Sequence, residues 1–163
     1  MPAVDDLVHV WRRMSADEVA HLERDPDAAA LVLVDSEPDE LFDVGRAWQA
    51  VHTLLTGSPW SGEGPAGDAV LGGVPLGDPS TYEPVRLLPP ERVAAVAALL
   101  RDLEPEELGR RYDAGAFRQA EVYPDVWLDP EALGGFVLPA YRRLREFHAD
   151  AAAAGDALLM QLR

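Results

Sequence analysis

His52 stands in the middle of the segment GRAWQAVHTLLTG (residues 45–57), and its imidazole is the group in this sequence best suited to acid–base chemistry. A free imidazole titrates near neutral pH, so it can exchange protons or bind a metal ion. The alternative is a structural role, in which a neutral ring donates a hydrogen bond to a loop carbonyl, because buried polar groups are normally paired. We favour the structural role and keep the chemical role as the competing hypothesis.

A second group of residues lies beside a glycine-rich stretch or within the irregular segment VYPDVW (residues 122–127). Half-buried aromatic side chains often line pockets in such segments, and an arginine among them can bind an anion. An ion pair of Arg86 with Glu121 or Glu83 would instead anchor the loop, and we favour this anchoring role. With the tryptophan and histidine of the first segment, the candidate pocket comprises Trp48, His52, Tyr82, Arg86, Glu121, Tyr123 and Trp127.

The elements that would position these residues follow from the spacing of apolar side chains. An apolar stripe at helical spacing predicts a helix over residues 44–56, which Gly57 would end. The stripe centres on Trp48 and Val51, so we expect His52 at its edge. Residues 58–84 are rich in Gly, Pro, Ser and Asp and predict a long loop. The candidate pocket would therefore be a cleft between this helix, this loop and residues 121–127.

The rest of the chain predicts short strands and helices without a regular βαβ order or an internal repeat. Leu7–Arg13 alternates like a strand, and Ser15 with Glu18 has the spacing of a capping box before a helix that ends near Arg24. We predict a single α+β domain over residues 1–163, with a small, mostly antiparallel sheet of three or four strands and about five helices. Further helices are expected over 91–103, 105–112 and 131–154, strands over 85–88 and 157–162, and either type over 30–34.

No motif of known chemistry has the context that its chemistry requires. The segment GEGPAG (residues 62–67) matches the dinucleotide fingerprint but lacks the preceding strand and following helix that would hold a pyrophosphate. The acids of residues 35–43 lack the glycine and final glutamate of a calcium loop. The four histidines, at positions 9, 21, 52 and 148, form no HxxxH pair, and the chain contains neither cysteine nor lysine. We therefore expect no metal and no cofactor.

The chain is strongly acidic, with 29 Asp and Glu against 14 basic residues and a net charge of −15. Residues 1–44 contain twelve of the acids and three arginines. Such a field repels nucleic acids and anionic membranes, so we expect neither as a partner, and it attracts basic proteins. The N-terminus lacks the basic region of a secretory signal, and the longest apolar run, residues 93–100, is far shorter than the ~20 residues that cross a bilayer. We therefore expect a cytoplasmic protein.

The first segment resembles the signature of the YfbM-like family (domain of unknown function 1877), which often reads K-x-W-x-x-[IL]-H-x-L-L-T-G. Three further segments resemble family segments in the same order: AVLGGVPLG (residues 69–77), the strand-to-helix step at residues 84–93, and VYPDVW. The resemblance covers residues 44–163 and implies a compact bacterial α+β domain without an assigned activity. The matched signature residues are Arg46, Trp48, Val51, His52, Leu54, Leu55, Thr56 and Gly57.

These observations favour a non-catalytic binding or interaction domain over an enzyme. The acidic charge suggests a basic protein as the partner, as for an inhibitor or an immunity-type protein. The alternative is a small-molecule-binding protein or an enzyme that uses a cleft around His52 and Arg86. The two hypotheses differ in whether a ring nitrogen of His52 faces a cavity.

Overall fold

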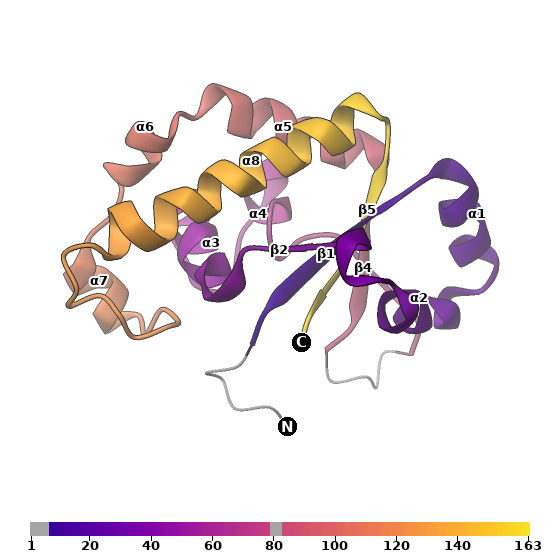
Figure 1. Cartoon of the computed structure of the whole chain (residues 1–163), viewed down its shortest axis with the longest axis horizontal. Helices are drawn as coiled ribbons and strands as arrows, with labels where there is room; N and C mark the ends of the chain where they lie inside the picture. Colours follow the sequence, from indigo (N-terminus) through magenta and orange to yellow (C-terminus); the bar gives the residue numbers. More distant parts are fainter. Residues whose placement is uncertain (1–6, 79–82) are drawn as a thin grey trace.

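A computed structural model describes residues 7–78 and 83–163 of the chain (Figure 1). The candidate pocket residue Tyr82 lies outside these residues. The described residues form a five-stranded sheet with the strand order β2-β1-β5-β4-β3, in which every neighbouring pair is antiparallel. The predicted α+β class with a small antiparallel sheet is therefore confirmed. The strands are β1 (His9–Met14), β2 (Leu41–Asp43), β3 (Val74–Leu76), β4 (Val85–Leu88) and β5 (Ala157–Leu162).

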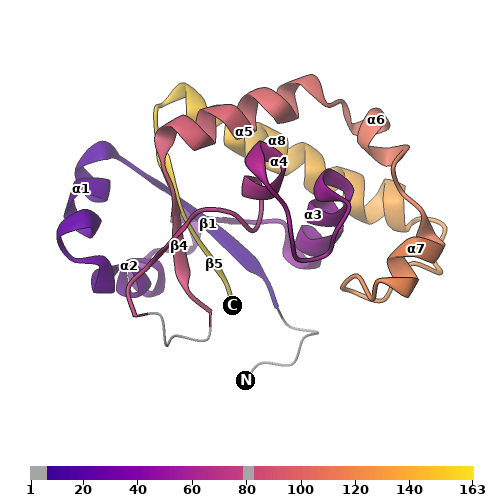
Figure 2. The same cartoon turned by 180° about the vertical axis from the view of Figure 1, so that it is seen from behind.

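Helices cover both faces of the sheet, as Figures 1 and 2 show. The larger core lies under α3, α4, α5 and α8, and the smaller core lies under α1 and α2. Helices α5 and α8 run side by side in both views. The helices are α1 (Ala16–Arg24), α2 (Ala29–Asp35), α3 (Trp48–Thr56), α4 (Gly64–Asp68), α5 (Pro90–Asp102), α6 (Pro105–Gly109), α7 (Ala114–Gln119) and α8 (Leu138–Ala153).

Strand β5 separates the two cores. Ala157 and Leu159 belong to the core under α1 and α2, whereas Leu158 and Met160 belong to the core under α3, α5 and α8. Successive side chains of a strand point to opposite faces of the sheet, and here both faces are covered. This is why the segment ALLMQL is almost continuously apolar instead of alternating.

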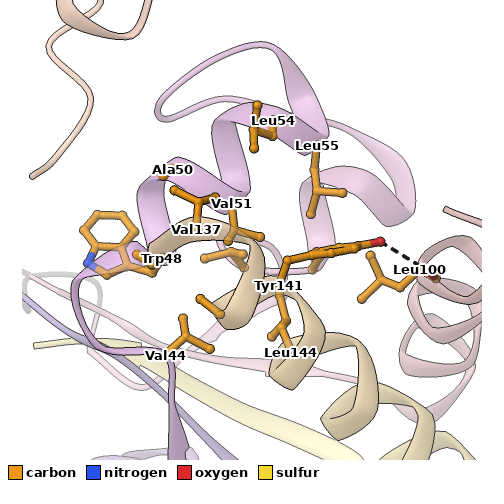
Figure 3. Packing of buried hydrophobic residues seen from close by; sticks show 14 of the residues in the cluster. Val44, Trp48, Ala50, Val51, Leu54, Leu55, Leu100, Val137, Tyr141 and Leu144 are labelled. Carbon is orange, nitrogen blue, oxygen red and sulfur yellow. Dashed lines mark hydrogen bonds between the residues drawn. The ribbon is translucent and has the colours of Figure 1, made fainter. Parts of the chain in front are cut away.

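Helix α3 carries the apolar stripe that the sequence predicts. Figure 3 shows the stripe facing Val137, Tyr141 and Leu144, which come from α8 and the turn before it. Trp48 is 0 % exposed, and its indole nitrogen donates to the carbonyl of Leu7 at 2.9 Å. The helix ends as predicted, because the residue that follows Thr56 is a glycine with φ of 85°, a left-handed conformation that favours glycine.

The predicted N-terminal helix is confirmed together with its cap. The side chain of Ser15 accepts from the Glu18 backbone at 3.3 Å, and the Glu18 carboxylate accepts from the Ser15 backbone at 3.0 Å. Two orphan N–H groups are thus satisfied at the start of α1. The ambiguous apolar run at residues 30–34 is helical and lies within α2.

The described sheet has five strands instead of the three or four predicted, and two predicted segments also differ from the structure. Residues 58–84 do not form one long loop, because they contain α4 and the edge strand β3. The helix predicted over 131–154 begins with a π-helical turn at Leu133–Val137 before α8 takes over. Pro139, in the first turn of α8, has no N–H to continue an α-helical ladder across this junction.

Candidate functional site

Gln49 connects helix α3 to two other segments of the chain. Its side-chain nitrogen donates to the carbonyl of Pro59 at 3.2 Å, and its side-chain oxygen accepts from the backbone N–H of Tyr123 at 2.7 Å. The side chain is 2 % exposed, so both bonds lie away from solvent. Gln49 therefore holds the start of the glycine-rich segment and the Tyr-Pro segment against the same helix.

His52 holds the same glycine-rich segment one turn further along α3. Its Nε2 atom lies 3.1 Å from the carbonyl oxygen of Ser61, so the predicted bond to a loop carbonyl is confirmed. A carbonyl only accepts, so Nε2 carries the ring proton and Nδ1 carries the lone pair. The side chain is 1 % exposed. Burial lowers the pKa of His52, and the nearby charge of Arg86 lowers it further, while the Ser61 bond opposes both effects.

His148 of α8 and Arg86 of β4 hold the next part of the segment. His148 Nε2 lies 3.2 Å from the carbonyl oxygen of Ala69, and Arg86 Nη1 donates to the carbonyl of Gly72. The other guanidinium nitrogen of Arg86 lies 2.7 Å from His9 Nε2. Because a guanidinium only donates, His9 must accept there and carries its proton on Nδ1. We call His9, His52, His148 and Arg86 the buried histidine cluster.

All three histidines of this cluster have lowered pKa values. Burial is the main cause for His9, whose pKa lies well below its usual value, and the Arg86 charge adds to it. Burial lowers the pKa of His148 to about 4, although the Ala69 bond opposes the shift. The Nδ1 atoms of His9, His52 and His148 are buried and have no hydrogen-bond partner in the described part of the chain. The cluster is thus a set of neutral rings beside one cation.

The expected ion pair of Arg86 is absent from the described residues. Glu83 forms no ion pair with Arg86 and influences it only as a nearby charge that raises its pKa. Glu121 forms no ion pair with Arg86 either; it is exposed after α7 and has φ of 56°. The anchoring role itself is present, because Arg86 binds the carbonyl of Gly72 in the glycine-rich segment. A backbone carbonyl replaces the predicted carboxylate.

The predicted pocket residues fall into separate groups. Trp48 and Tyr123 lie together, with ring centroids 5.9 Å apart, and Arg46 donates to the Tyr123 hydroxyl at 3.1 Å. Trp127 lies in a different aromatic group with Phe117, at a centroid distance of 5.0 Å, and it donates to a backbone carbonyl. His52 and Arg86 belong to the buried histidine cluster. Tyr123 and Trp127 are buried instead of half-buried.

Three hollows lie on the described surface away from the buried histidine cluster. One of about 450 Å³ lies between the end of α3 and α7, and one of about 380 Å³ lies between Arg46, the Tyr-Pro segment and the π-helical turn. The third, of about 300 Å³, lies between the start of α2 and the β3 edge of the sheet, and we call it the acidic groove. It is lined by Pro26, Asp27, Ala29, Ala30, Leu76, Gly77, Asp78, Val85 and Gln161.

The acidic groove continues onto an exposed apolar face of α2. Val34 lies one helical turn beyond Ala30, on the same side of the helix, and is 69 % exposed. Leu31 is 63 % exposed and is a neighbour of Val34 at helical spacing. Four exposed acids within eight residues of Leu31 in the sequence form no ion pair with the described residues: Asp27, Asp35, Glu37 and Asp39.

Residues 7–78 and 83–163 offer neither a metal site nor a membrane span. They contain no group of three or more His, Asp or Glu side chains placed to hold a metal ion. Their longest helices are too short or too polar to cross a bilayer.

Comparison with known proteins gives a family and a fold. The family model of the domain of unknown function DUF1877 matches residues 7–161. The crystal structure of YfbM from Escherichia coli, a protein of unknown function, is similar with a TM-score of 0.74 and 20 % sequence identity, over 96 % of this chain and 99 % of that chain. No curated protein matches the sequence. The match begins at residue 7, whereas the motifs that resemble the family begin only at residue 44. Because the family model matches most of the sequence, this chain belongs to the DUF1877 family.

Proposed function

We propose that this chain is a cytosolic protein-binding domain whose acidic groove and adjoining α2 face take a basic segment of a partner protein. The observation that carries the proposal is the pairing of exposed Leu31 and Val34 with a hollow lined by Asp27 and Asp78. An apolar patch rimmed by charge is typical of interaction sites. A partner segment with both apolar and basic side chains complements it.

The charge of the chain supports a basic partner. Residues 1–44 combine twelve acids with three arginines, and two of those arginines are already paired, Arg12 with Glu18 and Arg13 with Asp156. Acids around α2 that lack such partners leave a negative field at the groove. Complementary charge raises association rates and excludes acidic partners, and the apolar contacts then slow dissociation.

The buried histidine cluster supports a binding role over acid–base catalysis. Each Nε2 atom of the three histidines already has a partner, and each Nδ1 atom is buried. A general base must reach the substrate proton within hydrogen-bonding distance, directly or through one water. The acidic groove, in contrast, is lined by exposed residues such as Asp27 and Asp78, which a macromolecule can reach.

Fluorescence anisotropy with a labelled peptide of alternating arginine and leucine, measured at several NaCl concentrations, tests the proposal. The double variant Asp27→Asn/Asp35→Asn should weaken binding by about tenfold, since each exposed charge pair contributes about 0.5–1 kcal/mol. The matched control is Glu146→Gln/Asp150→Asn, which removes the same charge from exposed positions of α8 on the other face of the sheet. Equal weakening by both double variants, or no binding by the unmodified protein, would contradict the proposal.

A further inference from the structure

Arg86 holds a charge that no carboxylate in the described chain neutralises. The more solvent-shielded arginines otherwise have acidic partners: Arg12 bonds Glu18 at 2.8 Å and Glu40 at 2.9 Å, and Arg145 bonds Glu104 at 3.0 Å. Arg86 instead contacts a backbone carbonyl and a neutral ring, and Glu83 acts only as a more distant charge. A poorly solvated charge normally has an ionic partner.

Two hydrogen bonds hold the guanidinium of Arg86 in place, but they do not use all of its donors. It has five N–H donors, of which one is directed to Gly72 and one to His9. The Nε atom makes no hydrogen bond with the described residues, and the residue is partly exposed. Donors therefore remain available at a cation that two bonds already orient.

The chain around Arg86 is packed in a way that fixes this orientation. Arg86 pairs with Met160 across the β4–β5 ladder and with Pro75 across the β3–β4 ladder. Gly73, at φ of 95°, passes so close that an added Cβ would lie 3.2 Å from the Arg86 Cβ and 3.1 Å from the Met160 methyl group. The loop and the two neighbouring strands thus confine the side chain.

We propose that Arg86 is the anchor of a binding site for an oxyanion, the carboxylate or phosphate group of a small molecule. The planar guanidinium presents N–H groups in a fork that matches the geometry of these anions. His9 is a positioning residue, because it accepts from Arg86 and does not touch the anion. Burial lowers the pKa of Arg86 to about 10, so the guanidinium still carries its charge at neutral pH.

Titration of the full chain with sodium phosphate and, separately, with sodium acetate at constant ionic strength tests this site. The readouts are the NMR signals of the Arg86 Nε–H and of the Trp11 indole, whose ring contacts His9 at a centroid distance of 4.1 Å and an interplanar angle of 49°. We expect saturable shifts with at least one anion. The anion that binds with the higher affinity shows whether the natural ligand carries a phosphate or a carboxylate.

Variants separate the site from the net charge of the protein. Arg86→Gln should weaken binding at least tenfold, and Arg86→Lys should weaken it less, because a lysine keeps the charge but not the fork. Arg101→Gln is the matched control, because it removes the same charge from a surface arginine with 73 % side-chain exposure and should change nothing. His9→Gln, which offers an amide oxygen to Arg86, should retain binding.

The unmodified chain alone can overturn the proposal, even if a variant fails to fold. Absence of saturable shifts with both anions would show that Arg86 is a loop clamp only. Equal affinities for the unmodified chain and Arg86→Gln would do the same. Neither result contradicts the proposal that the acidic groove binds a basic segment, because that proposal is tested with a cationic peptide and separate variants.

Discussion

The buried histidine cluster and the acidic groove use polar side chains in opposite ways. In the cluster, burial keeps three histidines neutral, and their Nε2 atoms are paired with Ser61, Ala69 and Arg86. Around the groove, the acids Asp27 and Asp35 are exposed and form no ion pair with the described residues. The histidines of the first region use their Nε2 atoms to hold the chain together, whereas the acids of the second region remain available for a partner.

This difference shows that residue types typical of an active site can have a structural role, as they do in the signature segment of residues 45–57. The signature helix contains the residue types of an active site, but Trp48, Gln49 and His52 all bond to backbone groups of neighbouring segments. Changes at the three histidines should therefore lower stability, and changes at the acidic groove should alter binding with little effect on stability.

Trp48→Ala should produce the largest effect. Truncation of a fully buried tryptophan destabilises a protein by about 4 kcal/mol, and here the bond to Leu7 is lost as well. Urea unfolding at neutral pH measures this change. Trp60→Ala is the matched control, because Trp60 is 60 % exposed and should cost far less. Similar losses of unfolding free energy for the two variants would contradict the claim that Trp48 stabilises the fold through its burial.

The stability of the cluster should depend on pH through His148. Its folded pKa of about 4 lies below the ordinary value of 6.5, so the unfolded chain binds the proton more readily. Its contribution is present above pH 6.5 and is lost as the pH falls towards 4, a change of about 3 kcal/mol at 1.36 kcal/mol per pKa unit. Urea unfolding between these pH values measures it.

His148→Gln provides the comparison for that titration. Other titrating groups are common to both proteins, so the difference between their stability profiles isolates the histidine. Parallel profiles over the range from pH 6.5 to 4 would show that His148 is not held in the neutral form.

His52→Ala should have the next largest effect, a loss of about 2 kcal/mol from the missing bond to Ser61 and the void left behind. His52→Gln keeps an N–H donor in reach of the Ser61 carbonyl and should lose roughly half as much. Hydrogen exchange should show faster exchange of the amides of residues 58–73 in the alanine variant. Unchanged exchange there would contradict the clamping role.

Leu31→Ser should have the smallest effect on stability. A substitution at an exposed position normally changes stability by about 0.5 kcal/mol or less. The same change should weaken binding of the arginine–leucine peptide, because it removes part of the apolar face. A large fall in unfolding free energy would mean that α2 depends on Leu31 for its own packing.

Local patterns in the sequence predict much of the fold. The stripe on α3, the capping box of Ser15 and Glu18, and the glycine after Thr56 are signals between near neighbours in the chain, and all appear in the structure. Helix α7 was not predicted, although Asp113 caps it by accepting from the Ala116 backbone at 3.1 Å. With six residues, it is too short for an apolar period to stand out.

The cluster could be predicted only in part, because its members come from four distant elements. His9 shares the inward face of β1 with Trp11, and His148 follows Leu144 by one helical turn on the buried side of α8, so both had a signal for burial. Their meeting with His52 and Arg86 depends on strand order and helix packing, which no local pattern encodes. The partners of Arg86 were mispredicted for the same reason.

The protonation of the histidine rings tests the central claim most directly, and long-range proton–nitrogen NMR spectra of the full chain at pH 7 record it. If these rings are neutral clamps, His52 and His148 will carry the proton on Nε2, and His9 will carry it on Nδ1. A charged imidazolium at His52, or a proton on its Nδ1 atom, would contradict the account.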